Sequence, residues 1–403
     1  MNRTLNKPLL QFSRKKAANV LLGCFFVVTI IAPVAAVNKL LFGVLTLWML
    51  NDMLFARTAE VQVMTSPAII FAIFLYGFVL SLFNHADAAL ALQLVLGVLI
   101  LFQIWLIRRY QIDVERLVMI STVAMVVATM LLWCATFLPN MPMGPALLEF
   151  FRVYSLSAFG EREFFESATI SLHLGAAPIL FVGFALFAKK FCQERRIRDF
   201  LFALATTLAM LLSASRGIIA GAGLYFLILV LVYAPRRIRI LLALLLVAML
   251  AYSIHKILTS TSLLSASETS NAAKAGHVTS FLDQLTVPSL LFGRGLANWY
   301  YSVGVQSLKA ETEISPMDMV RYFGIVLTLI LYFCIVFPVR KIGSYIGGSL
   351  LDVVIFMIYL LLSFTNPIMF NSMGMLVILW YWSRIHAAHP VRRPAANTGT
   401  AFT

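Results

Sequence analysis

Residues 117–138 read LVMISTVAMVVATMLLWCATFL, a stretch without a charged side chain. Its length matches the roughly 20 apolar residues that an α-helix needs to cross the hydrocarbon core of a bilayer. Similar stretches recur along the chain between short charged clusters. Hydrophobic residues make up 61% of the 403 residues and charged residues only 12%, about half the charged fraction of a soluble domain. The sequence therefore predicts an all-α polytopic membrane protein.

The apolar stretches predict about twelve membrane-spanning helices. We expect them at residues 17–36, 39–56, 66–84, 88–107, 117–138, 170–188, 199–215, 217–234, 238–257, 319–338, 348–366 and 368–383. The segment before the first span is strongly basic, and the positive-inside rule assigns such a segment to the cytoplasm. An even number of spans then leaves both termini in the cytoplasm. Because the first run is long enough to span, we expect an anchor there rather than a cleaved signal peptide.

The net charge of +14 follows from this topology, since most basic clusters fall on the cytoplasmic side. A nucleic-acid partner is not expected, because that reading needs a basic face on a soluble domain. Nine basic residues are predicted instead on or near the outer face. They are Lys39, Arg152, Arg162, Arg216, Lys256, Lys274, Arg294, Lys309 and Arg321.

The predicted spans divide the chain into six parts. These are five spans in 1–138, an outer segment with an interfacial helix in 139–169, four spans in 170–257, a large outer loop in 258–318, three spans in 319–383 and a cytoplasmic tail in 384–403. The large loop thus lies between the ninth and tenth spans. Together the two outer segments could cap the outer mouth of the helix bundle.

The cysteines and histidines do not predict a metal site. The four cysteines form neither a CxxC pair nor a disulfide framework, and the six histidines are scattered along the chain. Only His277, in the large outer loop, remains a candidate for the functional site, because histidine is a frequent general base. We expect no metal and no cofactor.

Two arginines stand in unusual surroundings. Arg216 lies in Ser-Ala-Ser-Arg-Gly, residues 213–217, with apolar helices on both sides, and a charge at that depth usually has a partner or a ligand. The alternative is an arginine that reaches the bilayer surface. Arg294 lies between Gly293 and Gly295, where the missing side chains allow a tight turn and close approach of a ligand. The alternative there is a turn with a solvated arginine.

A third segment, residues 311–326, brings acids next to an arginine. Asp318 and Arg321 would lie one turn apart on a helix that starts near residue 315, either as an intrahelical ion pair or as part of a site with Glu313. Three arginines, Arg216, Arg294 and Arg321, suit a diphosphate, because guanidinium groups bind phosphate oxygens in pairs and keep their charge. A nearby carboxylate could take a proton from a sugar hydroxyl. These residue types together predict glycosyl transfer.

The order of these features resembles the O-antigen polymerase and ligase superfamily of bacterial inner membranes. The resemblance covers roughly residues 140–375 and consists of the Ser-Arg-Gly turn, the large outer loop, the Leu-Phe-Gly-Arg-Gly element and the acidic helix leading into Arg-Tyr-Phe-Gly-Ile. It implies a metal-independent glycosyltransferase that acts at the periplasmic face on sugars carried by undecaprenyl diphosphate. It also implies that Arg216 and Arg294 hold the donor diphosphate.

One departure separates two branches of that superfamily. Ligases of lipopolysaccharide typically carry a His-Asn pair in the outer helix, whereas this chain has Glu313 and Asp318 in that neighbourhood. This difference favours the polymerase branch, in which Glu313 or Asp318 would activate the acceptor and Arg216, Arg294, Arg321 and His277 would bind substrate.

The leading hypothesis is therefore an inner-membrane polymerase of polysaccharide repeat units. Its partners would be lipid-linked oligosaccharides as donor and acceptor, the lipid bilayer and, by family resemblance alone, a chain-length regulator. The alternatives are a ligase that transfers glycan to lipid A core or protein, and a transporter or flippase. Transporters tend to place functional charges near the membrane midplane, whereas the arginines here are expected at the outer face.

Overall fold

The structure, a computed structural model, describes the chain with several gaps. The described residues are 7–54, 63–138, 143–154, 157–164, 167–213, 215–237, 240, 269–312, 314–338, 350–364 and 366–387. Glu313 and all but one residue of the predicted ninth span, 238–257, lie outside them. So do the first part of the predicted outer loop and most of the C-terminal tail.

Helices make up the described chain as far as Tyr154. They are α1 (Lys7–Ile31), α2 (Ala36–Leu54), α3 (Thr65–Phe83), α4 (Ala88–Val98), the 3-10 helix η2 (Leu99–Gln103), α5 (Ile104–Tyr110), α6 (Val114–Phe137) and α7 (Gly144–Tyr154). The later elements are β1 (Ser157–Phe164), β2 (Ser167–Leu174), α8 (Pro178–Glu194), α9 (Ile197–Leu212), α10 (Arg216–Tyr233), α12 (Thr269–Asp283), α13 (Val287–Phe292), β3 (Tyr300–Ser302), β4 (Ser307–Lys309), α14 (Ser315–Val336), α16 (Leu350–Leu362) and α17 (Ser372–Ala387).

The described residues contain five helices that are long and apolar enough to cross a membrane. These are Thr65–Phe83, Ala88–Tyr110, Val114–Phe137, Arg216–Tyr233 and Ser315–Val336. The second of them runs through α4, η2 and α5, and α16 is a shorter apolar helix. The chain is therefore a multi-pass membrane protein built mainly from helices.

The sixth predicted span begins later than the sequence reading placed it. Residues 170–174 belong to strand β2, which pairs antiparallel with β1 from Ser157↔Leu174 to Phe164↔Ser167, and helix α8 starts only at Pro178. Apolar residues alternate with Ser, Thr and His through residues 167–174, which is the period of a strand rather than of a helix. Proline at the first helical position then favours a helix start.

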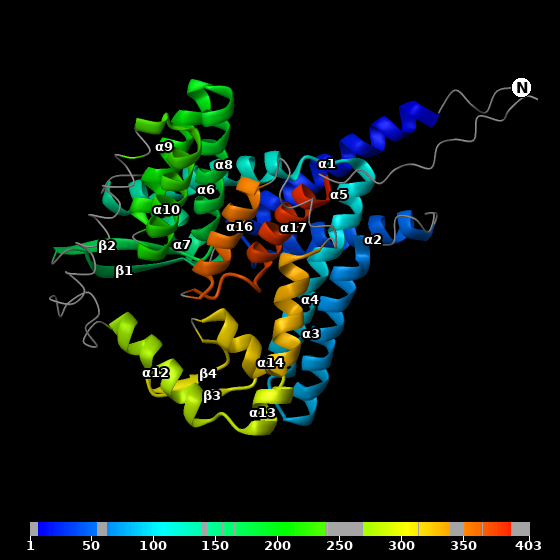
Figure 1. Cartoon of the computed structure of the whole chain (residues 1–403), viewed down its shortest axis with the longest axis vertical. Coiled ribbons are helices and arrows are strands. Elements are labelled where there is room, and N and C mark those ends of the chain that lie inside the picture. Colours follow the sequence, from blue (N-terminus) through cyan, green and yellow to red (C-terminus); the bar gives the residue numbers. More distant parts are fainter. Residues whose placement is uncertain are drawn as a thin grey trace, which may run out of the picture.

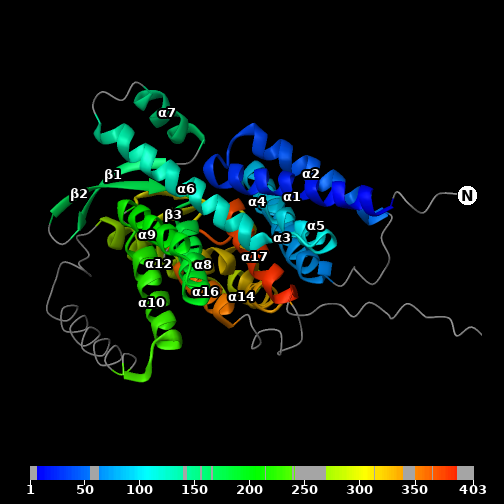
Figure 2. The same ribbon diagram turned by 90° about the horizontal axis from the view of Figure 1, so that it is seen from above.

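Helices α8 and α17 form the centre of the bundle (Figures 1 and 2). Every residue of α8 from Pro178 to Lys189 is buried, and α17 packs against α1, α4, α5, α6, α8, α16 and η2. A helix that is buried on all sides lies inside a bundle rather than at its surface. Gly183 of α8 allows a close crossing with α6, because a Cβ atom there would lie 2.1 Å from the Thr122 side chain.

Two glycines join α13 to α14 through direct backbone contact. Gly324 interrupts α14 with φ 77° and ψ 170°, and Gly293 ends α13 with φ 79°. A Cβ atom on Gly324 would lie 2.2 Å from the carbonyl oxygen of Leu291, and one on Gly293 would lie 2.3 Å from that of Tyr322. Only glycine fits both the positive φ and the short distance. Figure 1 shows α13 beside the end of α3 and beside α14, at the edge of the molecule that also holds β3 and β4.

We expect Gly324→Ala to lower the apparent melting temperature of the purified protein in detergent by about 5 °C or more. The positive φ strains an alanine backbone, and the new methyl group clashes with the backbone of α13. The matched control is Gly223→Ala in α10, where no atom lies within 4 Å of the added Cβ. Alanine also has the higher helix propensity, so this control should melt at or slightly above the wild-type temperature. Equal melting temperatures for the two variants would contradict the close contact of α13 with α14.

Candidate functional site

The structure brings Arg294 and Arg321 to one pocket. The backbone N–H of Arg294 donates to the carbonyl oxygen of Arg321 at 2.8 Å, and the N–H of Gly295 donates to that of Tyr322 at 3.0 Å. The pocket is small: its cavity volume is about 20 Å³, enough for about one water molecule. We call it the arginine pocket, and its lining residues are Phe281, Gln284, Leu285, Ser289, Arg294, Tyr300 and Arg321.

Arg321 is held on several sides and keeps one donor unused. Its side chain is 7% exposed. The Nη1 atom donates to the carbonyl oxygen of Asn298 at 3.0 Å, and Nη2 donates to that of Ala310. Within the described part of the chain, the buried Nε–H has no hydrogen-bond partner. An unsatisfied buried donor costs free energy, and an acceptor atom that reached this shielded N–H would remove that cost.

Asp318 fixes the other side of the same guanidinium. Its Oδ1 atom lies 3.1 Å from Nη2 of Arg321, so the intrahelical ion pair considered from the sequence is present. Both carboxylate oxygens also accept from the backbone N–H of Thr312, at 2.9 and 2.8 Å. The residue is only 4% exposed. In this arrangement Asp318 orients Arg321 and has little contact with solvent.

Arg216 lies at the same end of the helices but outside the arginine pocket. It begins α10, and five residues later Gly221 packs against Ile358 and Leu362 near the end of α16. The next residue of α16, Ser363, accepts a hydrogen bond at 3.1 Å from the N–H of Ser315, the first residue of α14. These contacts place the starts of α10 and α14 near each other.

His277 does not line the arginine pocket but touches a residue that does. It is 3% exposed, and its Nδ1 atom lies 2.6 Å from the hydroxyl oxygen of Tyr300 and 2.9 Å from Oγ of Ser302. Tyr300 lines the pocket, and burial raises the pKa of its hydroxyl to about 12. The hydroxyl therefore keeps its proton at neutral pH and can donate a hydrogen bond.

The structure thus groups three of the predicted residues, Arg294, Asp318 and Arg321, and links His277 to them through Tyr300. Glu313 lies outside the described residues. The sequence reading missed Tyr300, because a strand of three residues has too short a pattern to be recognised by its period. The nearest signal was the adjacent Gly-Arg-Gly turn, which ends five residues before Tyr300.

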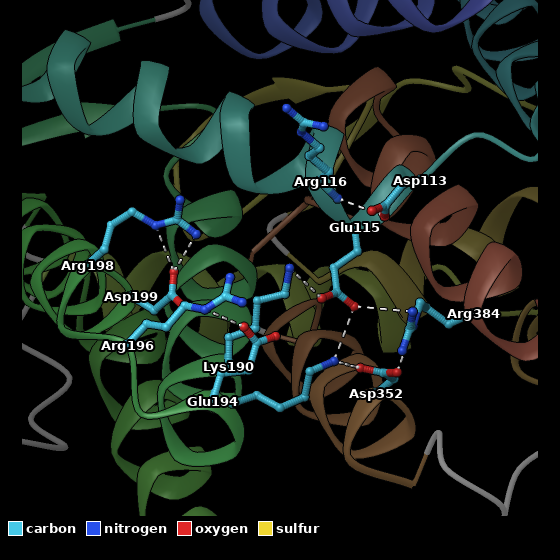
Figure 3. Close-up of polar contacts among 11 residues, drawn as sticks. Asp113, Glu115, Arg116, Lys190, Glu194, Arg196, Arg198, Asp199, Asp352 and Arg384 are labelled. Atoms are coloured by element: carbon cyan, nitrogen blue, oxygen red, sulfur yellow. Dashed lines mark hydrogen bonds and ion pairs between the residues drawn. The ribbon is translucent and has the colours of Figure 1, made fainter. Parts of the chain in front are cut away.

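A second group of charged residues lies elsewhere in the bundle around the buried side chains of Glu115, Lys189 and Asp352 (Figure 3). We call it the buried ion cluster, and it consists of Glu115, Lys189, Lys190, Asp352 and Arg384. Lys189 lies 2.5 Å from Asp352 and 3.3 Å from Glu115. Arg384 lies 2.9 Å from Asp352 and 3.4 Å from Glu115, and Lys190 lies 3.3 Å from Glu115. The cluster ties α6, α8, α16 and α17 together.

The buried ion cluster and the arginine pocket lie toward opposite ends of α16. Asp352 is in the first turn of this helix, whereas Leu362 at its end adjoins Ser363 and the start of α14. At a rise of about 1.5 Å per residue, Asp352 and Leu362 are separated by about 15 Å. The cluster residues were not predicted as a group, although Lys189, Lys190 and Arg384 were expected on one side of the membrane.

Within the described residues, no group of three or more His, Cys, Asp or Glu side chains is arranged to hold a metal ion. No protein-family model matches the chain, and no curated protein matches its sequence. The geometry of the arginine pocket and the sequence motifs around it are therefore the observations that bear on function.

We expect Asp352→Asn to destabilise the protein by about 3–5 kcal/mol, because it leaves the buried ammonium group of Lys189 and the partly exposed guanidinium of Arg384 with a single carboxylate, that of Glu115, between them. Thermal melting of the purified protein in detergent measures the effect. The matched control is Glu194→Gln, which removes a carboxylate from a partly exposed pair with Arg196 and should change stability by about 1 kcal/mol or less. A small effect of Asp352→Asn would mean that the cluster does not hold the four helices together.

Proposed function

We propose that this protein is a glycosyltransferase of the bacterial inner membrane that joins oligosaccharide repeat units carried by undecaprenyl diphosphate. The observation that carries the proposal is the meeting of Arg294 and Arg321 at one pocket, where Arg321 offers a buried Nε–H without a partner in the described chain. Two guanidinium groups at one pocket suit the paired oxygens of a diphosphate. The sequence motifs that supply these arginines are those of the polymerase resemblance.

The proposed topology has about twelve spans, with both termini in the cytoplasm and the arginine pocket at the periplasmic face. The five apolar helices of spanning length support the multi-pass part of this proposal. The buried ion cluster, which includes Lys189, Lys190 and Arg384, lies toward the opposite end of α16 from the pocket end. An excess of lysine and arginine is typical of the cytoplasmic side, and this supports the orientation.

The proposed reaction transfers the growing chain from one lipid carrier to the next repeat unit. The bond between the anomeric carbon and the diphosphate oxygen breaks, and undecaprenyl diphosphate leaves with the electron pair. Arg294 and Arg321 stabilise the negative charge that develops on the leaving group, and Arg216 contributes from the start of α10. A hydroxyl oxygen of the acceptor sugar forms the new glycosidic bond and gives its proton to a carboxylate.

The two candidate carboxylates have different roles in this proposal. Asp318 already accepts hydrogen bonds from Thr312 and pairs with Arg321, so it holds the cation in position. Glu313 then remains as the acceptor of the hydroxyl proton. No metal takes part, because the guanidinium groups supply the positive charge that the diphosphate requires.

The lipid-linked glycans of a strain that lacks the protein test the reaction. Undecaprenyl-bound sugars are extracted and sized by mass spectrometry. We expect single repeat units to accumulate and long chains to disappear. Long chains that accumulate on undecaprenyl diphosphate would instead indicate a ligase. If neither the single units nor the long chains on the lipid change in amount, the result would contradict both the polymerase and the ligase and favour transport.

Point variants test the site. We expect Arg294→Ala and Arg216→Ala to reach the membrane in normal amounts but to lower polymer formation about 100-fold or more, as the loss of a charge-stabilising donor does in other enzymes. The readout is polymer length in the strain complemented with each variant. Arg152→Ala is the control, because this arginine is mostly exposed and pairs only locally with Glu149. Full-length polymer from Arg294→Ala would overturn the assignment of the arginine pocket.

A further inference from the structure

We propose that His277 and Tyr300 are a pair of positioning residues that hold the Arg321 guanidinium in the orientation in which it binds phosphate. The inference rests on the proposed function, because it takes the arginine pocket to be a phosphate site. It assigns a role to Tyr300 and gives His277 an indirect role in place of direct substrate binding.

The ring of Tyr300 lies against the charge of Arg321. The Cζ atom of the guanidinium lies 4.4 Å from the centroid of the ring, within the range of a cation–π interaction. Both side chains are buried, Tyr300 with 4% and Arg321 with 7% of its surface exposed. An interaction of this kind is stronger where water is excluded. The ring therefore covers one face of the guanidinium, and the centroid of the Tyr322 ring lies 5.0 Å from the same Cζ atom.

His277 fixes the tyrosine from the other side. The Tyr300 hydroxyl lies 2.6 Å from Nδ1 of His277, and this nitrogen accepts the hydrogen bond in the neutral tautomer that carries its proton on Nε2. A phenol that donates a hydrogen bond has a more electron-rich ring, which strengthens its attraction to the cation above it. Ser302 provides a second polar contact to the same nitrogen at 2.9 Å. The histidine thus acts on Arg321 through Tyr300.

Close backbone packing brings α12 near enough for this contact. A Cβ atom on Gly276 would lie 2.2 Å from Cα of Gly304, and one on Gly304 would lie 2.3 Å from the carbonyl oxygen of Ala273. One turn after His277, Oγ of Ser280 accepts a hydrogen bond from the N–H of Val303 at 2.9 Å. Helix α12 is therefore fixed on the turn between β3 and β4, and His277 faces Tyr300 as a result.

The guanidinium of Arg321 is preorganised for binding an anion. Its two Nη atoms are engaged by carbonyl oxygens and by Asp318, and the ring of Tyr300 limits rotation of the guanidinium plane. The Nε–H, unpaired in the described chain, is the donor left for the pocket. A cation held in advance loses less conformational entropy when it binds an anion. Loss of the ring should therefore weaken anion binding even though the charge itself remains.

Binding of inorganic diphosphate to the purified full-length protein in detergent tests this role. Isothermal titration gives the dissociation constant for the wild type and for the variants. We expect Tyr300→Leu, which removes the ring, to raise the Kd about tenfold. Tyr300→Phe and His277→Asn keep a ring over the guanidinium but break the hydroxyl contact, and each should raise the Kd about threefold.

A double variant separates a shared effect from two independent ones. Tyr300→Phe combined with His277→Asn should raise the Kd about threefold and not about tenfold, because both changes break the same hydrogen bond. The matched control is Tyr301→Leu, in the next position of β3, where the side chain is 51% exposed. Its Kd should equal that of the wild type. Melting temperatures of all variants report any loss of folding, and Tyr300→Phe and His277→Asn preserve most of the packing if Tyr300→Leu does not fold.

The possible outcomes distinguish this inference from the proposed function. A wild-type protein that does not bind diphosphate overturns both. If the wild type binds diphosphate and Arg294→Ala removes the binding, the phosphate site stands, and wild-type affinity in folded Tyr300→Leu then overturns the positioning role alone. Effects of Tyr300→Phe and His277→Asn that multiply in the double variant would show that His277 does not act through Tyr300.

Discussion

The arrangement of the site depends on one backbone contact, the approach of residues 293–295 to the kink of α14 at Gly324. The left-handed φ values of Gly293 and Gly324, together with the short distances between their backbones and the opposite segment, allow two hydrogen bonds between chain segments 27 residues apart. The N–H of Arg294 donates to the carbonyl oxygen of Arg321. As a result, two cations lie at one pocket in spite of their mutual repulsion. The backbone hydrogen bonds hold the two arginines close together, and Asp318 and Tyr300 reduce the repulsion between their charges.

The two groups of buried charges in the protein differ in a way that bears on function. In the buried ion cluster, Lys189 and Arg384 each contact both Glu115 and Asp352, so positive and negative groups alternate around a closed set. Such a set holds helices together, but its charges largely cancel, so it exerts little electrostatic attraction on a ligand. At the arginine pocket, by contrast, a single described carboxylate, that of Asp318, pairs with Arg321, while Arg294 lines the same space. Glu311 also acts on Arg321 through its charge, so the Nε–H, which has no partner in the described chain, is the feature that favours an anion there.

Much of the helical framework could be predicted from hydropathy alone, because runs such as 117–138 need no long-range information. The start of α8 was placed too early, since the apolar residues of 170–174 were read as a continuation of the helix although their alternation is that of a strand. The proximity of Arg294 and Arg321 could be predicted only from the hypothesis that both bind one diphosphate. Contacts between distant segments leave no local pattern in the sequence. Tyr300 was not predicted because its strand of three residues is too short to show a period, and the partners of Asp352 were not predicted because pairing depends on the tertiary packing of several helices.

The position of the arginine pocket bears on the choice between an enzyme and a transporter. A transporter that works by alternating access exposes a site near the membrane midplane to each side in turn, and its helix bundles move against each other around that site. Here the pocket is lined by residues of α12, α13, β3 and α14, among others, and Figure 1 shows these elements toward one edge of the molecule. The buried ion cluster ties four helices toward the other end of α16. Separation of those helices would break the ion pairs of the cluster, and a charge left buried without its partner would cost about 3–5 kcal/mol. A site that stays open to one side of the membrane is compatible with glycosyl transfer, whereas alternating access would have to overcome that cost in every cycle.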